Sequence, residues 1–206
     1  MAGIDPAGSG STVKADPACL RSARHIASRI FGEILKEGDL AVDATLGTGQ
    51  DCERLCRLVG ETGQVYGFDV QQQALDLTRE RLEASGISGR ASLILAGHER
   101  MMEFVPPGIK LAAFNLGWLP GSDKEITTRA ETTLMAIGAA LRLLCIYGMV
   151  VVCVYPGHRE GAREQAALLD FAGRLPPNAF TVLWHQFMNG GPGVPGCLLI
   201  EKIKEN

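Results

Sequence analysis

Residues 41–51 read Ala-Val-Asp-Ala-Thr-Leu-Gly-Thr-Gly-Gln-Asp. The apolar start of this stretch ends in an acid, Asp43, and the chain then passes through Gly47 and Gly49 into a segment of helical length. Glycines in such a turn let the backbone approach a ligand closely. The stretch therefore predicts a strand, a ligand-binding turn and a helix, which together open an α/β domain.

Short apolar runs recur on both sides of this unit. Both alternating sets of positions in these runs are apolar, which is typical of strands buried on two faces. The runs cover residues 40–44, 64–68, 91–96, 111–116 and 149–155, and segments of helical length cover residues 50–59, 72–85, 124–144 and 159–174. This alternation predicts right-handed βαβ units and a mainly parallel sheet with helices on both faces.

The two ends of the chain depart from this alternation. Asp16 and Pro17 predict the start of a helix that runs to about Leu35, after a flexible tail over residues 1–15. Runs at 179–187 and 196–203 follow each other without a helix, which predicts an antiparallel strand pair at one edge. We therefore expect a single domain over residues 16–206, of Rossmann-like α/β class with seven strands.

Composition limits the function classes. The chain has 206 residues, of which 46% are hydrophobic, and a net charge of −3. These values favour one folded domain and exclude a disordered chain or a protein that coats nucleic acid through its overall charge. The cysteines form no C-x-x-C pair and no run approaches the ~18 apolar residues of a membrane span. We expect reduced thiols, no metal site, no membrane contact and a cytoplasmic protein.

A second acid follows the next expected strand. Asp69 ends residues 65–69, where a carboxylate can accept two hydrogen bonds from a ribose diol. A dinucleotide-binding G-x-G-x-x-G motif would place a third glycine where Cys52 stands, so the spacing disfavours NAD. An acid before the turn, Asp43, suits a cofactor with an amine and a sulfonium. With the terminal antiparallel pair, this layout resembles the class I methyltransferases that use S-adenosylmethionine.

That resemblance implies a cofactor site. The acid Asp43 and the glycines of the first turn would line the methionine part of the cofactor. Asp69 would hold the ribose, and His98, after the third strand, would lie near the adenine. The implied cofactor-binding residues are Asp43, Thr45, Gly47, Gly49, Asp51, Asp69, Gln71 and His98.

The fourth strand runs into residues 114–121, Phe-Asn-Leu-Gly-Trp-Leu-Pro-Gly. This loop is similar to the Asn-Pro-Pro-Tyr loop of amino-group methyltransferases. The similarity implies that the Asn115 amide oxygen and the Leu116 carbonyl accept hydrogen bonds from a target amine, while Trp118 packs on the acceptor. Because the methyl group of a sulfonium is already activated, positioning supplies most of the rate and no covalent nucleophile is required. Asn115 and Trp118 are the implied catalytic residues.

Longer motifs point to one family. Residues 115–124 (Asn-Leu-Gly-Trp-Leu-Pro-Gly-Ser-Asp-Lys), 132–134 (Thr-Thr-Leu), 155–161 (Tyr-Pro-Gly-His-Arg-Glu-Gly) and 199–202 (Leu-Ile-Glu-Lys) resemble a small bacterial family of rRNA methylases that is associated with tRNA (mnm5s2U34) methylation. The resemblance implies methylation of the aminomethyl group of 5-aminomethyl-2-thiouridine at the tRNA wobble position. The implied substrate-binding residues are Leu116, Asp123, Lys124, Tyr155 and His158.

The chain departs from the family pattern in three places. The family reads Gly-Asn-Gly-His-Asp-Thr where residues 47–52 read Gly-Thr-Gly-Gln-Asp-Cys, and Tyr-His-Gly-His where residues 155–158 read Tyr-Pro-Gly-His. Its Asn- and Pro-rich loop before the last strand is Asn-Gly-Gly-Pro-Gly-Val-Pro over residues 189–195. The glycines and Asp51 remain, so we expect cofactor binding to be kept, and the changes bear more on the substrate.

The expected partner is the tRNA anticodon loop. Basic side chains on the first helix and near the substrate loops would contact its phosphates. They are Arg21, Arg24, His25, Arg29, Lys124, Arg129, Arg159 and Arg163. The proton acceptor stays open among Asp123, His158 and Glu160, and residues 134–147 either belong entirely to the core or leave one face for a homodimer.

Two other functions remain open from the sequence. One is the same fold acting on rRNA or on a small-molecule amine. The other is a NAD- or nucleotide-binding protein without methyl transfer.

Overall fold

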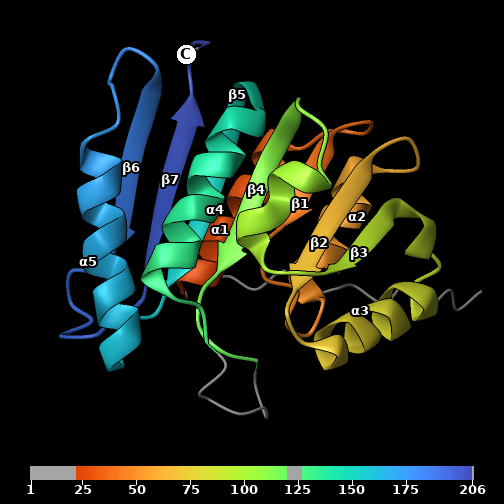
Figure 1. The fold of residues 1–206 in the computed structure, drawn as a ribbon, viewed down its shortest axis with the longest axis horizontal. Helices are drawn as coiled ribbons and strands as arrows, with labels where there is room; N and C mark the ends of the chain where they lie inside the picture. The colour runs from red at the N-terminus through yellow and green to blue at the C-terminus, as the bar shows by residue number, and fades with distance from the viewer. Residues whose placement is uncertain (1–21, 120–126, 206) are drawn as a thin grey trace, which may run out of the picture.

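A seven-stranded sheet forms the centre of the computed structural model, which describes residues 22–119 and 127–205 (Figure 1). The strand order is β3-β2-β1-β4-β5-β7-β6, in which β7 runs antiparallel to both neighbours and the other pairs are parallel. The strands are β1 (Leu40–Asp43), β2 (Gln64–Asp69), β3 (Ala91–Leu95), β4 (Ile109–Asn115), β5 (Leu144–Val154), β6 (Phe180–Gln186) and β7 (Gly196–Lys202). The predicted sheet, with its antiparallel edge pair, is confirmed.

Helices cover both faces of the sheet, as predicted. One core cluster contains side chains of α1 (Ala23–Ile34), α2 (Gln50–Val59) and α3 (Gln72–Ala84). The other contains side chains of α4 (Ala130–Leu143), α5 (Arg159–Gly173) and the 3-10 helix η2 (His98–Glu103). Figure 1 shows α4 and α5 in front of the sheet and α1 and α2 behind it. None of the helices in the two described ranges is long and apolar enough to cross a bilayer.

Two predicted helix starts are wrong. The first helix begins at Ala23 rather than at Pro17, because the extended Ser22 caps it and accepts a hydrogen bond from the backbone N–H of His25. Asp16, Pro17 and the expected tail over residues 1–15 lie outside the described residues. The helix expected from residue 124 begins at Ala130, since Thr127 pairs with Trp118 in an isolated β-bridge.

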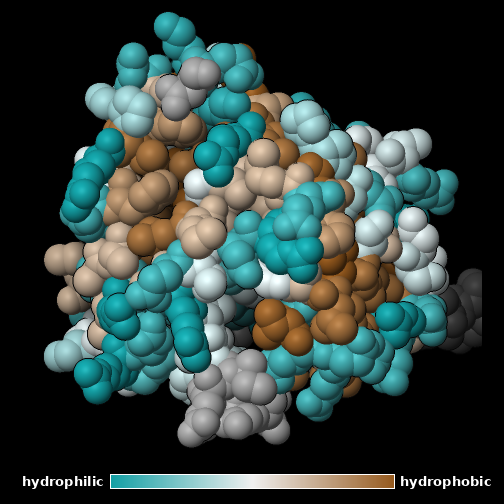
Figure 2. All heavy atoms as spheres, viewed as in Figure 1, coloured by the Kyte–Doolittle hydropathy of each residue, from teal (hydrophilic) through white to brown (hydrophobic). Residues whose placement is uncertain are grey.

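The stretch 134–147 is mainly core. Its buried residues belong to α4 and to the start of β5, which begins at Leu144 and not at the expected residue 149. Within it Met135, Ile146 and Tyr147 are exposed. Figure 2 shows the molecule from the side on which α4 and α5 cover the sheet. Hydrophobic atoms reach the surface there beside α4.

The turn between β1 and α2 depends on its two glycines. Gly47 and Gly49 have φ angles of +52° and +74°, which disfavour residues with a side chain. A Cβ on Gly49 would lie 2.8 Å from both Cα and Oγ1 of Thr78 in α3. Gly49 therefore lets α2 and α3 approach each other while it supplies the left-handed backbone that starts α2.

Gly49→Ala tests this double requirement. We expect it to lower the free energy of unfolding by more than the roughly 1–2 kcal/mol that a left-handed backbone alone costs. Gly86→Ala is the matched control, because Gly86 has a φ of +66° and a Cβ added there would meet nothing within 4 Å. Urea denaturation measures both, and equal losses would show that the contact with Thr78 is irrelevant.

Candidate active site

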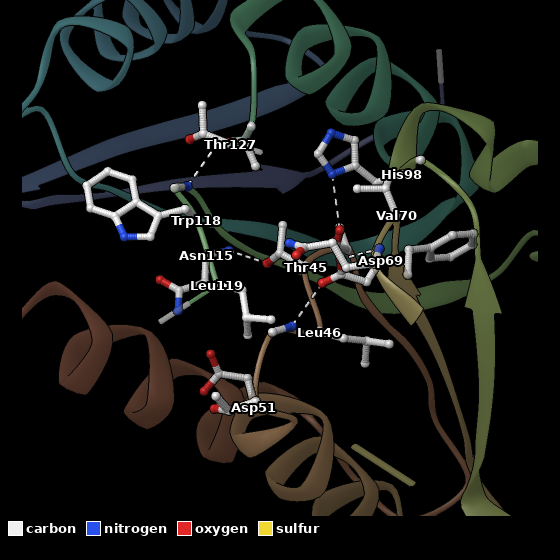
Figure 3. A pocket seen from close by; sticks show the side chains of 18 of the residues that line it. Thr45, Leu46, Asp51, Asp69, Val70, His98, Asn115, Trp118, Leu119 and Thr127 are labelled. Atoms are coloured by element: carbon white, nitrogen blue, oxygen red, sulfur yellow. Dashed lines mark hydrogen bonds between the residues drawn. The ribbon is translucent and has the colours of Figure 1, made fainter. Parts of the chain in front are cut away.

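A cleft of about 270 Å³ opens at the carboxyl ends of β1, β2 and β4 (Figure 3). The strand order changes direction between β1 and β4, and ligands of open α/β sheets bind in the crevice at such a switch point. Figure 3 shows Asp69, Val70 and His98 on one side of the cleft and Trp118 on the other, with Asp51 below. The cleft therefore joins most of the residues expected for the cofactor to Asn115 and Trp118, the residues expected for catalysis.

Asp69 connects β2 to the glycine turn. Its Oδ2 accepts a hydrogen bond from the Gly47 N–H at 3.1 Å, and its Oδ1 accepts one from the Gln71 N–H at 3.0 Å. Both backbone donors fix the carboxylate at the lip of the cleft, and each oxygen keeps a further lone pair for a ligand. Thr45, Gly47, Asp69 and Gln71 all line the cleft, as expected from the sequence.

Asp43 and Gly49 lie elsewhere than expected. Neither lines the cleft: Gly49 packs against α3, and Asp43 is 1% exposed beneath the turn. The Oδ1 of Asp43 accepts a hydrogen bond from the Thr45 N–H at 3.1 Å, whereas its Oδ2 has no partner among the described residues. Burial, followed by the charge of Asp51, raises the pKa of Asp43 to about 8. The structure thus places the Asp43 carboxyl group beneath the turn, and its contact with a cofactor stays a prediction.

His98 closes the adenine side of the predicted site. Its ring is buried, its Nδ1 lies 3.0 Å from the Ala44 carbonyl, and its edge meets the ring of Phe114 at 5.8 Å between centroids. Burial lowers the pKa of His98, so the ring is neutral near pH 7. Because a carbonyl only accepts, Nδ1 carries the proton and Nε2 is left as an acceptor.

Two residues at the cleft, Asn115 at the end of β4 and Thr127, carry buried oxygen atoms without partners among the described residues. The Asn115 N–H donates to Thr45 Oγ1 at 2.7 Å, which holds this residue beside the first turn. Asn115 Oδ1 and Thr127 Oγ1 are buried, and neither has a hydrogen-bond partner among the described residues. Both residues line the cleft. Two acceptors without partners at this wall fit a ligand that brings N–H groups.

A hydrogen-bond chain holds the loop after β4. The Gly117 N–H donates to Thr128 Oγ1, and the Thr128 hydroxyl donates to Glu164 Oε2, both at 2.9 Å. Thr133 donates to the other oxygen of Glu164, also at 2.9 Å. Burial raises the pKa of Glu164 against the opposing effect of these two threonine bonds. The loop is therefore fixed to α4 and α5 through one buried carboxyl group.

The predicted substrate residues that the structure describes do not line the cleft. His158 caps α5, since its Nδ1 accepts from the Gly161 N–H at 3.2 Å, and its ring meets Trp118 edge-on at 4.8 Å. Leu116 is buried, and Tyr155 packs half-buried in the core cluster of α1. Asp123 and Lys124 lie outside the described residues. Of the predicted catalytic pair, Asn115 and Trp118 both line the cleft.

Sequence reasoning missed some residues of the cleft. Arg24, assigned above to an RNA-binding surface, lines the cleft and forms an ion pair with Asp51. The threonines of the cleft wall were also missed, because the expected helix from residue 124 absorbed them; they are Thr127, Thr128 and Thr132. The isolated bridge between Trp118 and Thr127 brings this segment to the site, and no short motif signals such a bridge.

Comparison with known proteins assigns this chain to a family. A family model described as "Putative rRNA methylase" matches residues 65–201. The chain belongs to this family. The putative rRNA methylase of Clostridium thermocellum superposes with a TM-score of 0.87 and 36% identity, over 89% of this chain and 99% of that one. By family and by fold, this chain is a methyltransferase of the S-adenosylmethionine-dependent class.

Two further relatives bear on ligand and substrate. A putative methyltransferase of Streptococcus mutans, solved in complex with SAH, has a TM-score of 0.81 and 35% identity over 89% of this chain and 99% of that one. The chloroplastic tRNA (mnm(5)s(2)U34)-methyltransferase of Arabidopsis thaliana is 33% identical over 179 residues, 82% of this chain. The chain spans 65% of the length of that plant relative.

The geometry fits S-adenosylmethionine independently of these relatives. Asp69 offers lone pairs at the end of β2, the glycine turn brings backbone close to the cleft, and His98 offers a neutral acceptor. Arg24 and Asp51 place both signs of charge at another part of the cleft. These groups match a ribose, an adenine and a zwitterionic amino-acid end.

Asp43→Asn tests the buried carboxyl group. The folded protein keeps a proton up to about pH 8 that the unfolded chain releases near 3.8. Unfolded chains thus bind fewer protons in this window, so stability falls as pH rises, by up to about 1.4 kcal/mol per pH unit. The Asn variant is expected to lack this component in urea titrations from pH 4 to 8. Asp76→Asn, on the surface of α3, is the control that keeps it; an unchanged slope in Asp43→Asn would contradict the assignment.

Proposed function

We propose that this chain transfers a methyl group from S-adenosylmethionine to the aminomethyl group of 5-aminomethyl-2-thiouridine at the wobble position of tRNA. The observation that carries the proposal is the buried, unpartnered Oδ1 of Asn115 at the wall of the cleft. The name of the plant relative and the family motifs support the choice of nucleoside.

Asn115 would orient the amine. S-adenosylmethionine supplies a methyl group that is already activated on a sulfonium. A neutral primary amine has two N–H groups and one lone pair; Asn115 Oδ1 accepts one N–H and Thr127 Oγ1 can accept the other. With both N–H groups held at the wall, the lone pair faces the cleft. This second acceptor replaces the Leu116 carbonyl expected from the sequence, since Leu116 does not line the cleft.

Trp118 is placed to receive a base. The residue is 37% exposed and lines the cleft, and its ring contacts the His158 ring edge-on. Single-stranded RNA loops are read by stacking unpaired bases on aromatic side chains. A wobble base turned out of the anticodon loop would stack here and bring its aminomethyl group to Asn115.

A basic surface beside this mouth supports an RNA substrate. Arg129, Arg159 and Arg163 are exposed at the starts of α4 and α5, although Arg163 pairs with Glu131 at 2.7 Å. Contacts of such residues with phosphates make binding fall with rising salt. Arg21 and Lys124 of the predicted surface lie outside the described residues, and a cytoplasmic location stays a prediction.

The alternatives predict different ligands. The family description favours rRNA as the second candidate substrate, and weak binding of tRNA that does not depend on salt would favour rRNA or a small-molecule amine. A protein that binds NAD instead would be stabilised by NAD and not by S-adenosylhomocysteine in thermal shift, because only a ligand of the native state raises the melting temperature.

The first test is nucleoside mass spectrometry of tRNA that carries 5-aminomethyl-2-thiouridine, after incubation with the protein and S-adenosylmethionine. We expect one added methyl on that nucleoside alone. Methylation of rRNA in a parallel incubation, with tRNA unchanged, would favour the second candidate. S-adenosylhomocysteine binding measured beside it shows whether a negative result concerns the substrate or the cofactor.

Two variants separate the two halves of the cleft. Asn115→Ala is expected to lower methyl transfer by about a hundredfold with S-adenosylhomocysteine affinity unchanged, because it removes only amine positioning. Asp69→Ala is expected to weaken S-adenosylhomocysteine binding by about tenfold or more, through lost hydrogen bonds to a charged group. Asn178→Ala, exposed before β6, is the control for both assays. If Asn115→Ala and Asp69→Ala each lost S-adenosylhomocysteine affinity and turnover to the same extent, this division of roles would be contradicted.

A further inference from the structure

Arg24 reaches the cleft from outside the βαβ units. It lies in α1, behind the sheet, and donates from Nε and Nη2 to Asp51 Oδ1 in the first turn of α2, at 3.3 and 3.0 Å. Both side chains line the cleft and are largely shielded, with side-chain exposures of 36% for Arg24 and 16% for Asp51. Two opposite charges from separate elements thus meet at the wall of a binding cleft.

The ion pair leaves one guanidinium nitrogen of Arg24 and one carboxylate oxygen of Asp51 without a contact to each other. Both nitrogens of Arg24 contact the same carboxylate oxygen, so the contact is not the two-oxygen fork that Arg and carboxylate groups commonly form. No hydrogen bond among the described residues involves Arg24 Nη1 or Asp51 Oδ2. The cleft therefore retains a guanidinium donor and a carboxylate acceptor side by side.

The position of the pair suits one end of a long ligand. Figure 3 shows Asp51 well separated from His98, with Asp69 and Leu46 between them. A ligand with its base near His98 and its sugar at Asp69 would extend its remaining part toward Asp51. A guanidinium and a carboxylate held together recognise a group with both charges, the α-carboxylate and α-ammonium of an amino acid.

We propose that Arg24 and Asp51 form the subsite for the amino-acid end of the cofactor, in which Arg24 donates to the α-carboxylate and Asp51 Oδ2 accepts from the α-ammonium. This assignment rests on the proposed use of S-adenosylmethionine. It moves Arg24 from the RNA-binding surface to the cofactor, and it gives α1 a direct part in binding. The mutual ion pair holds both side chains in place before the ligand arrives.

Isothermal titration calorimetry with two ligands tests the subsite. S-adenosylhomocysteine carries the amino-acid end, whereas 5′-methylthioadenosine shares the nucleoside and lacks that end. Arg24→Met is expected to weaken S-adenosylhomocysteine binding by about tenfold to a hundredfold and to leave 5′-methylthioadenosine binding unchanged. Asp51→Asn is expected to show the same selectivity, and Arg24→Lys, which keeps the charge without the fork, an intermediate loss.

Arg29→Met is the matched control. Arg29 lies on the same helix with its side chain 58% exposed, and it does not line the cleft. Both ligands should bind this variant as they bind the unaltered protein. Circular dichroism checks the fold of each variant, and if Arg24→Met does not fold, Asp51→Asn and Arg24→Lys carry the comparison.

Two results would overturn the subsite. Equal weakening of both ligands in Arg24→Met would show that Arg24 only supports the fold of the cleft, and unchanged S-adenosylhomocysteine binding would show that Arg24 does not contact the ligand. Neither result touches the proposed methyl transfer. Failure of the unaltered protein to bind S-adenosylhomocysteine would instead refute the proposed function itself.

Discussion

The hydrogen bond from the Gly47 N–H to the Asp69 carboxylate fixes the turn after β1 against the end of β2. Gly49, two residues on, lets α2 pack on Thr78 of α3, so the direction of α2 follows from the same turn. Asp51 in the first turn of α2 then faces Arg24 of α1. These contacts form one connected assembly, in which a displaced turn would move Asp69 and the charged pair together.

The substrate half of the cleft is held in place by other contacts. Asn115 is tied to the first turn through Thr45, but the loop after it is held from the opposite layer of helices. There Glu164 is buried beneath Thr128 and Thr133; burial raises the pKa of its carboxyl group, and the two hydroxyl donors oppose that shift. The two halves meet at the end of β4 and are held by different contacts, so variants of each half are expected to separate cofactor binding from turnover.

Local sequence patterns predicted the strands, the antiparallel edge pair and part of the lining of the cleft, because strand burial and turn chemistry depend on neighbouring residues. They could not place Asp43, since every residue of a strand buried on both faces is shielded and the pattern does not say which side chains reach the ligand. They also did not show that Arg24 lines the cleft. Its partner lies 27 residues away on another helix, and only the packing of α1 against α2 brings the two charges together.

The same packing decides what the departures from the family pattern mean. Three positions of the first turn differ, and they are not equivalent: Cys52 is fully buried in the core cluster, whereas Thr48 and Gln50 line the cleft. Thr48 is held through its backbone, because its carbonyl accepts from Arg81 Nε at 2.9 Å. A backbone contact is insensitive to the side chain at that position, so the turn keeps its path. Gln50 is exposed, and its change alters the lip of the cleft and leaves the groups that hold Asp69 and Asp51 in place.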